Sequence, residues 1–539
     1  MAASSQITLA PKYYLANFHK LLCHVEHLYA DFLNHEESLW LARFRKLTND
    51  AQCLLIRLMT RKGEWFRSDK LHYPELDSID SCIAELVNQR FINDTVAVDI
   101  TTLATALLTK AEILHLFPEL PKNLRKPELL QTLAATNASL PLNLPFTAVQ
   151  LLDNDKLALF CLLFFGNQHQ EFAQFVLNDL GIHRFEHYEI SASTRLFNSR
   201  EDVDTAMALH ILSEQYKHID KTCETSLTQL SLHIPTTKGS YSSRLAGKLI
   251  NAIGRDFERL NNFEQAIHLL KQTDLPPARE RCVRMYMKQE HFHQAQSVTM
   301  AMIEKPKNVP EQEVAFRLAS TVAKKLRTSP PKPVLFSIPE RKLTLDLTTQ
   351  RVELAVRDSL VNEGWQAFYL ENHFLNTLFG LAFWDIIFAP VDGAFINPYQ
   401  RQPLDLYRDS FKTKRQGMID TRLAEIRQSG IWKFISLIED KYGLQNPFIA
   451  WDLVDREWIE LAVTTIPNHT LAALFDTMLI DLKAYRTGMP DLIAFKANKW
   501  FWCEVKGPGD RLQDNQKRWM RVFRELKLNY EVCYVESAL

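Results

Sequence analysis

The sequence predicts a multidomain, mostly α-helical protein that ends in an α/β domain, and three observations lead to this prediction. The chain has 539 residues, which is more than one hydrophobic core usually contains, so about three or four domains are expected. Glycine is scarce, with 15 residues, which disfavours folds made of many tight turns. Apolar residues recur at helical spacing through most of the chain, and strand-like runs appear mainly near its end.

Composition narrows the class of protein. Hydrophobic residues make up 46% of the chain and charged residues 24%, so a wholly disordered or fibrous protein is excluded. The formal net charge is −1, so any nucleic-acid site must be a local basic patch. The eight cysteines contain no C-x-x-C pair, which favours reduced thiols over disulfides or a zinc site. We expect no membrane partner, because the apolar runs are too short or carry a charge, and we expect a cytoplasmic, nucleoid-associated protein in a bacterium or a nuclear one in a eukaryote.

Residues 1–98 are predicted to form an N-terminal helical region. Apolar positions three and four apart predict two helices between residues 13 and 45, and helices at 50–61 and 78–89 precede a short strand after Arg90. This order of short elements is typical of a winged-helix unit that binds DNA. Basic residues that could contact phosphates gather near the helix at 50–61: Arg57, Arg61, Lys62, Arg67 and Lys70. The alternative interpretation is a solvated basic helix end, which the helix dipole favours.

Residues 99–190 and 191–330 are also predicted to be helical. In the first region, a helix, an extended proline-containing link and a second helix resemble a SAP module. In the second, residues 259–266 are echoed at residues 288–295, each time with an aromatic residue three positions before an alanine, which indicates TPR-like helical hairpins. Three arginines between the echoes could hold a phosphate, with an exposed structural face as the alternative: Arg279, Arg281 and Arg284.

A proline-rich stretch at residues 327–342 precedes the predicted C-terminal domain, residues 340–539. Two short aromatic and β-branched runs flank a polar turn and predict a β-hairpin. The hairpin brings Asp491, at the start of one strand, towards Glu504 and Lys506 at the end of the other. Alternation along the strand places Glu504 and Lys506 on one face and turns Val505 to the other.

These residue types suit metal-dependent hydrolysis of phosphodiesters. Carboxylate oxygens of Asp491 and Glu504 are ligands that Mg²⁺ and Mn²⁺ prefer, and Val505 can add its backbone carbonyl. Lys506 can orient the attacking water or stabilise negative charge on phosphate. The pattern is the PD–x(n)–ExK signature, although an exposed Glu/Lys pair on a strand is the commoner explanation of such a string taken alone.

The residues around the hairpin favour the functional interpretation. Residues 513–526 predict an amphipathic helix that carries Gln516, and a final strand follows, so the order matches the core of the restriction-endonuclease-like fold. The segments GMPDLIAF, WFWCEVKGPGDRLQDNQKRWM and YEVCYV resemble the VRR-NUC domain of the Fanconi-anaemia-associated nuclease family. Upstream, Glu371 precedes TLFGLAFWDIIF, which is similar to the family's helix, and the resemblance implies that Glu371 is a further metal ligand. Asn372 stands where the family commonly has glycine.

The resemblance also implies a function. It reaches the N-terminal SAP-containing region, and it is closest to the shorter bacterial type that lacks a ubiquitin-binding zinc finger. It implies a structure-specific DNA nuclease that cleaves 5′ flaps, degrades DNA from 5′ to 3′ and acts in interstrand crosslink repair. It further implies a basic pocket for a 5′-terminal phosphate. We expect two Mg²⁺ or Mn²⁺ ions, which would stabilise the attacking and leaving oxygens together. Gln516 could contact the water or the scissile phosphate, with a purely structural cap or turn role as the alternative. Two alternatives stay open: a non-catalytic scaffold that binds DNA junctions, and a nuclease of the same fold that acts on other branched DNA.

Overall fold

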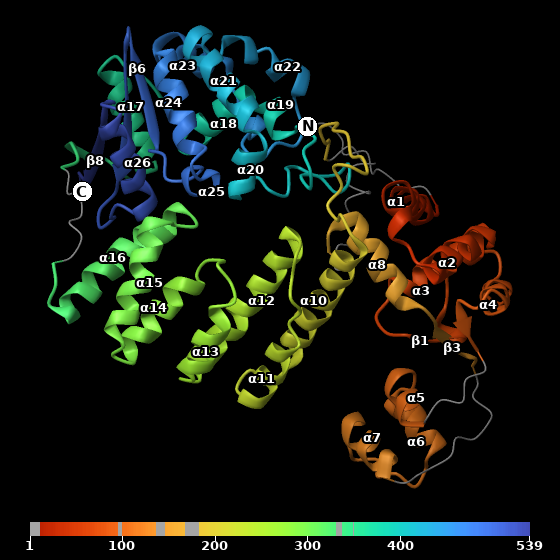
Figure 1. Ribbon diagram of the computed structural model, residues 1–539. Helices are drawn as coiled ribbons and strands as arrows, with labels where there is room; N and C mark the ends of the chain where they lie inside the picture. Colours follow the sequence, from red (N-terminus) through yellow and green to blue (C-terminus); the bar gives the residue numbers. More distant parts are fainter. Residues whose placement is uncertain are drawn as a thin grey trace. The chain divides into compact units, whose positions relative to one another are not determined.

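Figure 1 shows the protein as a computed structural model, which describes residues 11–94, 100–135, 146–167, 183–329, 337–348 and 350–538. The chain forms two compact units, residues 1–180 and 181–539, and each is described by itself. The helical pattern predicted for residues 168–180 and most of the proline-rich boundary, residues 330–336, lie outside the described residues. No helix in the described part of the chain is long and apolar enough to cross a membrane.

The first unit begins with the four predicted helices. They are α1 (Tyr13–Tyr29), α2 (His35–Lys46), α3 (Asn49–Met59) and α4 (Ile79–Asn88), with the 3₁₀ turns η1 (Ala30–Phe32) and η2 (Ser68–Lys70). Helix α2 starts where Asn34 and Glu37 form a capping box, and the Thr48 side chain caps α3. The apolar faces of α1 and α2 meet where Phe18 lies against Phe44, with 5.2 Å between the ring centroids. The predicted helical pair and the two helices after it are therefore confirmed.

A small antiparallel sheet completes this unit. Its strands are β1 (Trp65–Arg67), β2 (Ile92–Asn93) and β3 (Ala148–Leu151), in the order β1-β3-β2. The predicted strand after Arg90 is β2, but β3, which lies between β1 and β2, comes from the region that the sequence assigned to residues 99–190. Helix α8 (Asn154–Phe165) packs here too, since Phe160 lies 5.4 Å from the ring of Trp40 in α2.

The predicted SAP-like region is an insertion between β2 and β3. It consists of α5 (Ile100–Ala106), α6 (Lys110–Leu116) and α7 (Lys126–Ala135). Helix α6 starts with a capping box between Thr109 and Glu112. Apolar side chains of the three helices, including Leu103, Ile113 and Leu129, form a small core of their own. The region predicted as residues 99–190 thus contains an inserted helical module followed by elements that complete the first unit.

The second unit starts with a helical array, as predicted. Its helices are α10 (Arg200–His218), α11 (Glu224–Leu232), α12 (Ser240–Arg259), α13 (Phe263–Leu270), α14 (Ala278–Lys288), α15 (Phe292–Glu304) and α16 (Val309–Leu326). The internal echo corresponds to the α12–α13 and α14–α15 turns. Asn261 and Glu290 occupy equivalent left-handed positions there, with φ of 60° and 61°. Ala266 and Ala295 are both fully buried, because the small side chain lets the neighbouring helix approach closely.

A five-stranded mixed sheet forms the centre of the C-terminal part. Its strands are β4 (Glu340–Leu345), β5 (Gln366–Tyr369), β6 (Leu492–Lys496), β7 (Lys499–Lys506) and β8 (Tyr530–Ser537), in the order β4-β8-β7-β6-β5. Strands β4, β8 and β7 are parallel, and β7, β6 and β5 are antiparallel. The predicted hairpin, helix and final strand are therefore confirmed as β6–β7, α26 (Asp514–Glu525) and β8.

Helices cover both faces of this sheet. On one face α17 (Val352–Asn362) packs on Leu492 and Val505, and on the other α26 packs on Ile493 and Trp502. The remaining helices and 3₁₀ turns are α18 (His373–Ala382), α19 (Trp384–Ile387), α20 (Asp409–Lys414), α21 (Gln416–Ser429), η3 (Trp432–Phe434), α22 (Leu437–Lys441), η4 (Trp451–Leu453), α23 (Arg456–Thr465), α24 (Asn468–Met478) and α25 (Leu482–Tyr485). Residues 183–190, which the sequence grouped with the SAP-like region, pack against the loop between α19 and α20: Tyr188 stacks on Phe395 at 3.8 Å.

Candidate metal-dependent active site

The β6–β7 hairpin brings the sequence-predicted carboxylates together. Leu492 pairs with Cys503 across the hairpin, so Asp491 lies beside the end of β7. The backbone N–H of Val505 donates to Asp491 Oδ2 at 2.8 Å. On the same strand Lys506 Nζ lies 2.7 Å from Glu504 Oε1, as expected for side chains two residues apart on one face. The approach predicted for these three side chains is observed.

Glu371 is placed next to this group by backbone hydrogen bonds. It follows β5, and the N–H groups of Leu370 and Glu371 donate to the carbonyl of Asp491 at 3.1 and 3.0 Å. Glu371 has φ of 46°, a left-handed conformation that is uncommon for residues other than glycine. Asn372 Nδ2 donates to Glu371 Oε1 at 2.7 Å, and Asn372 Oδ1 accepts from the N–H of Met489 at 3.1 Å. Asn372, at the position where the family commonly has glycine, therefore links the Glu371 carboxylate to the backbone of Met489.

Gln516 reaches the group from helix α26. Its Nε2 donates to Glu504 Oε1 at 2.5 Å. Its Oε1 accepts from the N–H of Gln513 at 2.9 Å, which closes a capping box at the start of α26. Gln516 thus contacts a carboxylate and caps its own helix, so the helix start and the orientation of Glu504 depend on each other.

Burial raises the pKa values of Asp491 and Glu504, so both carboxylates stay protonated to higher pH than usual. Burial raises the pKa of Asp491 to about 6, although the Val505 N–H and Lys506 act against it. Burial also raises the pKa of Glu504 to about 8, and the charge of Asp491 adds to this. Glu371 contributes repulsion to both groups. Several carboxylates that repel one another at one place favour the binding of a cation there.

The donor set fits a divalent metal ion. Glu504 is fully buried, and its Oε2 has no hydrogen-bond partner, which costs free energy unless a cation or donor occupies that side. Among the residues that the structure describes, no three His, Cys, Asp or Glu side chains converge closely enough to hold a metal by themselves. Coordination would therefore also use the Val505 carbonyl, water and phosphate oxygens, which is the usual way in which Mg²⁺ is held.

One acidic residue of the site was not foreseen from the sequence. Glu353 lies in the first turn of α17, and its charge raises the pKa of Asp491 further, after burial. The same turn approaches the catalytic strand, since a Cβ on Gly507 would lie 3.8 Å from Val352 Cγ1. Glu353 belongs to an ordinary amphipathic helix with no motif, so only the packing of α17 against the sheet could reveal it.

The basic residues predicted in the first unit have mixed surroundings. Arg57 pairs with Glu75 at 2.8 Å, and Arg61 donates to the hydroxyl of Tyr73 at 3.2 Å. Lys62 and Lys70 are exposed. Arg67 is buried, and its guanidinium pairs with Asp69 at 2.9 Å and Glu112 at 2.7 Å. Because both partners are already in place, Arg67 connects the small sheet to α6 and is not available to DNA.

The three arginines of the helical array are neutralised by carboxylates. The pairs are Arg279 with Glu311, Arg281 with Glu258, and Arg284 with Glu280, at 2.6, 2.6 and 2.7 Å. Glu311 is nearly fully buried, and Arg279 Nη2 also donates to the carbonyl of Lys305. The structural alternative raised by the sequence therefore describes this face better than phosphate binding does.

A different set of cations interacts electrostatically across several elements. It comprises Arg244 and Lys248 of α12, Arg408 before α20, and Lys483 of α25. Burial and the like charges of the other three lower the pKa of Lys248, and burial and Arg244 lower the pKa of Arg408, against the opposing charge of Asp405. None of the four forms an ion pair within the part of the chain that the structure describes. We call this set the cation cluster; sequence analysis missed it because its members are far apart in the chain.

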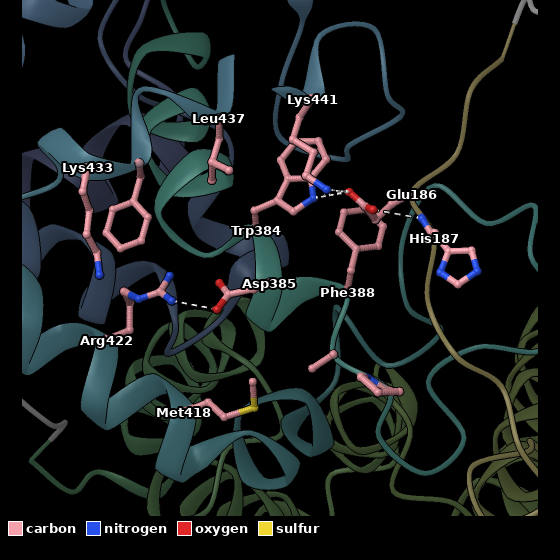
Figure 2. A pocket seen from close by; sticks show the side chains of 13 residues that line it. Glu186, His187, Trp384, Asp385, Phe388, Met418, Arg422, Lys433, Leu437 and Lys441 are labelled. Carbon is pink, nitrogen blue, oxygen red and sulfur yellow. Dashed lines mark hydrogen bonds and ion pairs between the residues drawn. The ribbon is translucent and has the colours of Figure 1, made fainter. Parts of the chain in front are cut away.

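A pocket of about 550 Å³ lies elsewhere in the second unit, and Figure 2 shows its lining. Trp384 and Phe388 form an aromatic wall, and Arg422, Lys433 and Lys441 lie at the rim. Trp384 Nε1 and Lys441 Nζ both donate to Glu186 at 2.6 Å. None of the residues that the sequence predicted for the site lines this pocket.

Together the mixed sheet, the hairpin carboxylates and the adjoining lysine define a nuclease. Three family models match the chain: "VRR-NUC domain" at residues 431–537, "FAN1, HTH domain" at 12–93 and "Fanconi anemia-associated nuclease SAP domain" at 103–140. A Fanconi-associated nuclease 1 homolog of Pseudomonas aeruginosa is 33% identical, over 97% of this chain and 96% of the relative. The chain belongs to the Fanconi-associated nuclease 1 family.

Other relatives and two solved structures agree with this assignment. The homolog of Oryza sativa subsp. japonica is 26% identical over 97% of this chain and 62% of its own length. The crystal structure of paFAN1 bound to 2nt 5′ flap DNA with gap aligns with a TM-score of 0.83 and 32% identity, over 99% of both chains. The same protein bound to 1nt 5′ flap DNA with gap aligns with a TM-score of 0.82 and 32% identity, over 98% of this chain and 100% of that one. The predicted mostly helical, multidomain fold class is therefore confirmed.

Proposed function

We propose that this protein is a structure-specific DNA nuclease that cleaves 5′ flaps with Mg²⁺ or Mn²⁺, degrades DNA from 5′ to 3′, and acts in interstrand crosslink repair. The observation that carries the proposal is the meeting of Asp491, Glu504 and Lys506 around a buried carboxylate oxygen without a partner. Nothing in the packing of a hairpin requires repelling carboxylates to face each other, so a functional cation explains them. The solved relatives bound to 5′ flap DNA support the choice of substrate.

We assign each residue a role from its position. Asp491, Glu504 and the Val505 carbonyl would hold one ion, and Glu371, the most exposed of the carboxylates, would share a second ion with the DNA. Bound divalent ions supply an activated water and neutralise charge at the attacking and leaving oxygens. Lys506 Nζ, which lies 2.7 Å from Glu504 Oε1, would donate to the water or to a phosphate oxygen. Gln516 fixes the orientation of Glu504.

DNA contacts outside the hairpin are assigned by charge. In the first unit Arg57, Arg61, Lys62 and Lys70 remain proposed phosphate contacts, with Lys62 and Lys70 the most accessible. In the second unit we transfer the proposed phosphate site from the paired arginines of α14 to the cation cluster. Four like charges that repel one another are costly in the free protein, although Asp405 offsets part of this at Arg408, and a phosphate anion would relieve the remaining cost.

The double substitution Arg244→Ala/Lys248→Ala is expected to weaken binding of a 5′-phosphorylated flap by about tenfold. It should also lower the slope of log Kd against log salt, because fewer counterions are released when fewer phosphates are neutralised. Binding is measured by fluorescence anisotropy in a salt series, with 5′-phosphate and 5′-hydroxyl ends compared. Arg284→Ala serves as the control, since Arg284 is already paired with Glu280. An unchanged Kd and an unchanged slope would contradict a phosphate site at the cation cluster.

One panel of substrates tests the proposed function. Purified protein with Mn²⁺ or Mg²⁺ is offered a labelled 5′ flap, blunt duplex, single strand and four-way junction in parallel titrations. We expect metal-dependent cleavage that favours the 5′ flap and is lost with a chelator. Cleavage that favours another branched substrate would support the second candidate, a same-fold nuclease with a different specificity. Tight binding to junctions with no cleavage of any substrate would show that the protein is a non-catalytic scaffold and would refute the proposed function.

A further inference from the structure

One buried guanidinium connects three helices around the active site. Arg518 lies in α26 and is 6% exposed. Its Nε and Nη2 donate to the two carboxylate oxygens of Glu313 in α16 at 2.9 and 2.8 Å. Its Nη1 donates to the backbone carbonyl of Ala484 in α25 at 2.8 Å. All three donor directions of the side chain are therefore used, each towards a different element or oxygen, in a geometry that a lysine cannot reproduce.

Two of the connected helices carry part of the proposed machinery. Helix α26 presents Gln516, which donates to Glu504 at the metal site. Helix α25 presents Lys483, a member of the cation cluster, directly before Ala484. Helix α16 is the last helix of the helical array, and it lies against α26 in Figure 1. Arg518 thus links the helix that carries Lys483 to the helix that carries Gln516.

Neighbouring contacts make this connection short and stiff. Asp481 caps α25 and its Oδ2 also accepts from the N–H of Val309, at the start of α16, at 3.0 Å. Trp519 Nε1 donates to the carbonyl of Tyr485 at 3.2 Å. After α25, Gly488 has φ of 88°, and a Cβ there would lie 2.6 Å from the backbone of Asn515. Only glycine allows this close approach, so the chain between α25 and Asp491 is held directly on α26.

We propose that Arg518, together with Glu313, is a positioning residue that sets the distance between the cation cluster and the metal site, and thereby which phosphodiester bond of a bound strand is cut. The inference rests on the proposed nuclease function and adds a determinant of the incision position. Arg518 touches neither metal ligand nor DNA in this assignment; it acts through Gln516 on one side and through the α25 backbone on the other. Catalysis is sensitive to such placement, because a shift of about 1 Å can lower a rate by about a hundredfold.

The test compares Arg518→Lys and Glu313→Gln with the wild-type chain. Both changes retain polarity but break the two-pronged contact, so folding is kept while the fit is loosened. On an end-labelled 5′ flap we expect incision to spread over adjacent bonds and kcat to fall about tenfold, with KM changed less than about twofold. Arg317→Ala is the matched control: it breaks the exposed pair with Asp514 between the same two helices, and exposed pairs contribute little.

Binding readouts keep the test independent of turnover. Mn²⁺ affinity is measured by calorimetry, and end preference is measured as binding to a 5′-phosphate end relative to a 5′-hydroxyl end. Both should weaken in Arg518→Lys and Glu313→Gln, and both should stay at the wild-type value in Arg317→Ala. Folding of each variant is checked by thermal melting. The positioning role of Arg518 would be overturned if both folded variants kept the wild-type incision positions, kcat, Mn²⁺ affinity and end preference. That result would leave the proposed nuclease function intact. A wild-type chain that cuts no DNA would refute the proposed function, while the two affinities still decide the positioning role.

Discussion

Asp491→Ala is expected to reduce Mn²⁺-dependent cleavage of a 5′ flap by about a thousandfold or more. The carboxylate accepts the Val505 N–H and faces the strand end where Glu504 and Lys506 lie, so its loss would remove a proposed metal ligand and loosen the strand end. A metal centre contributes several kcal/mol to charge stabilisation in the transition state. The measurement is single-turnover cleavage of an end-labelled flap with excess protein.

DNA binding by the Asp491→Ala variant should stay within a few-fold of the wild type. Phosphate contacts elsewhere supply most of the affinity, so a lost metal ligand affects the rate far more than the Kd. Asp476→Ala is the control, since Asp476 pairs with Lys412 at 3.6 Å away from the hairpin. Lys506→Ala should likewise abolish cleavage. Residual activity of Asp491→Ala above about one-tenth of the wild-type rate would be incompatible with a metal ligand at this position.

Glu504→Gln is expected to stabilise the metal-free protein at pH 8 by a few kcal/mol, which is a shift of several degrees in Tm. Burial raises the pKa of Glu504 in the folded protein from its ordinary 4.5 to about 8. The folded state therefore keeps the proton longer than the unfolded state, and the wild type loses stability as pH rises from about 4.5 to about 8. A glutamine cannot ionise, so the variant avoids that loss; below about pH 4.5 the two proteins should melt alike.

Adding metal should reverse the order of stability. Mn²⁺ binds the ionised carboxylate, so it should raise the Tm of the wild type at pH 8 and have little effect on Glu504→Gln. Calorimetric melts of both proteins at pH 4.5, 6 and 8, with and without Mn²⁺, give the complete comparison. Parallel melting curves for the two proteins across this range would show that Glu504 titrates normally and is not the buried ligand assigned here.

The catalytic hairpin could be predicted from sequence because its information is local. Asp491, Glu504 and Lys506 lie within sixteen consecutive residues, and strand alternation together with one tight turn determines which side chains meet. The helical array could be predicted for the same reason, since its 3.6-residue period and its echo are properties of short segments. Glu371 needed the family resemblance, because its place depends on the pairing of β5 with β6, more than 100 residues apart.

The features that sequence analysis missed depend on long-range packing. Strand β3 is four residues long and pairs with strands on the far side of an inserted module, so no local pattern shows its partner. Arg67 follows a basic helix end and looked available to DNA, but tertiary packing buries it against Glu112. The residues of the cation cluster come from α12, the segment before α20, and α25, so the cluster can be recognised only when the chain is folded.

The position of β8 in the sheet determines when the C-terminal domain can fold during synthesis on the ribosome. Strand β8 lies in the interior of the mixed sheet, between β4 and β7, and it is formed by residues 530–537. The helical array and the first unit precede it in synthesis and can fold as they emerge. The mixed sheet cannot form completely until β8 is released, so Glu504 and Lys506 on β7 gain their parallel neighbour only at the end of synthesis. A chain interrupted before residue 530 would lack the strand that pairs with β7, and the proposed site would be incomplete.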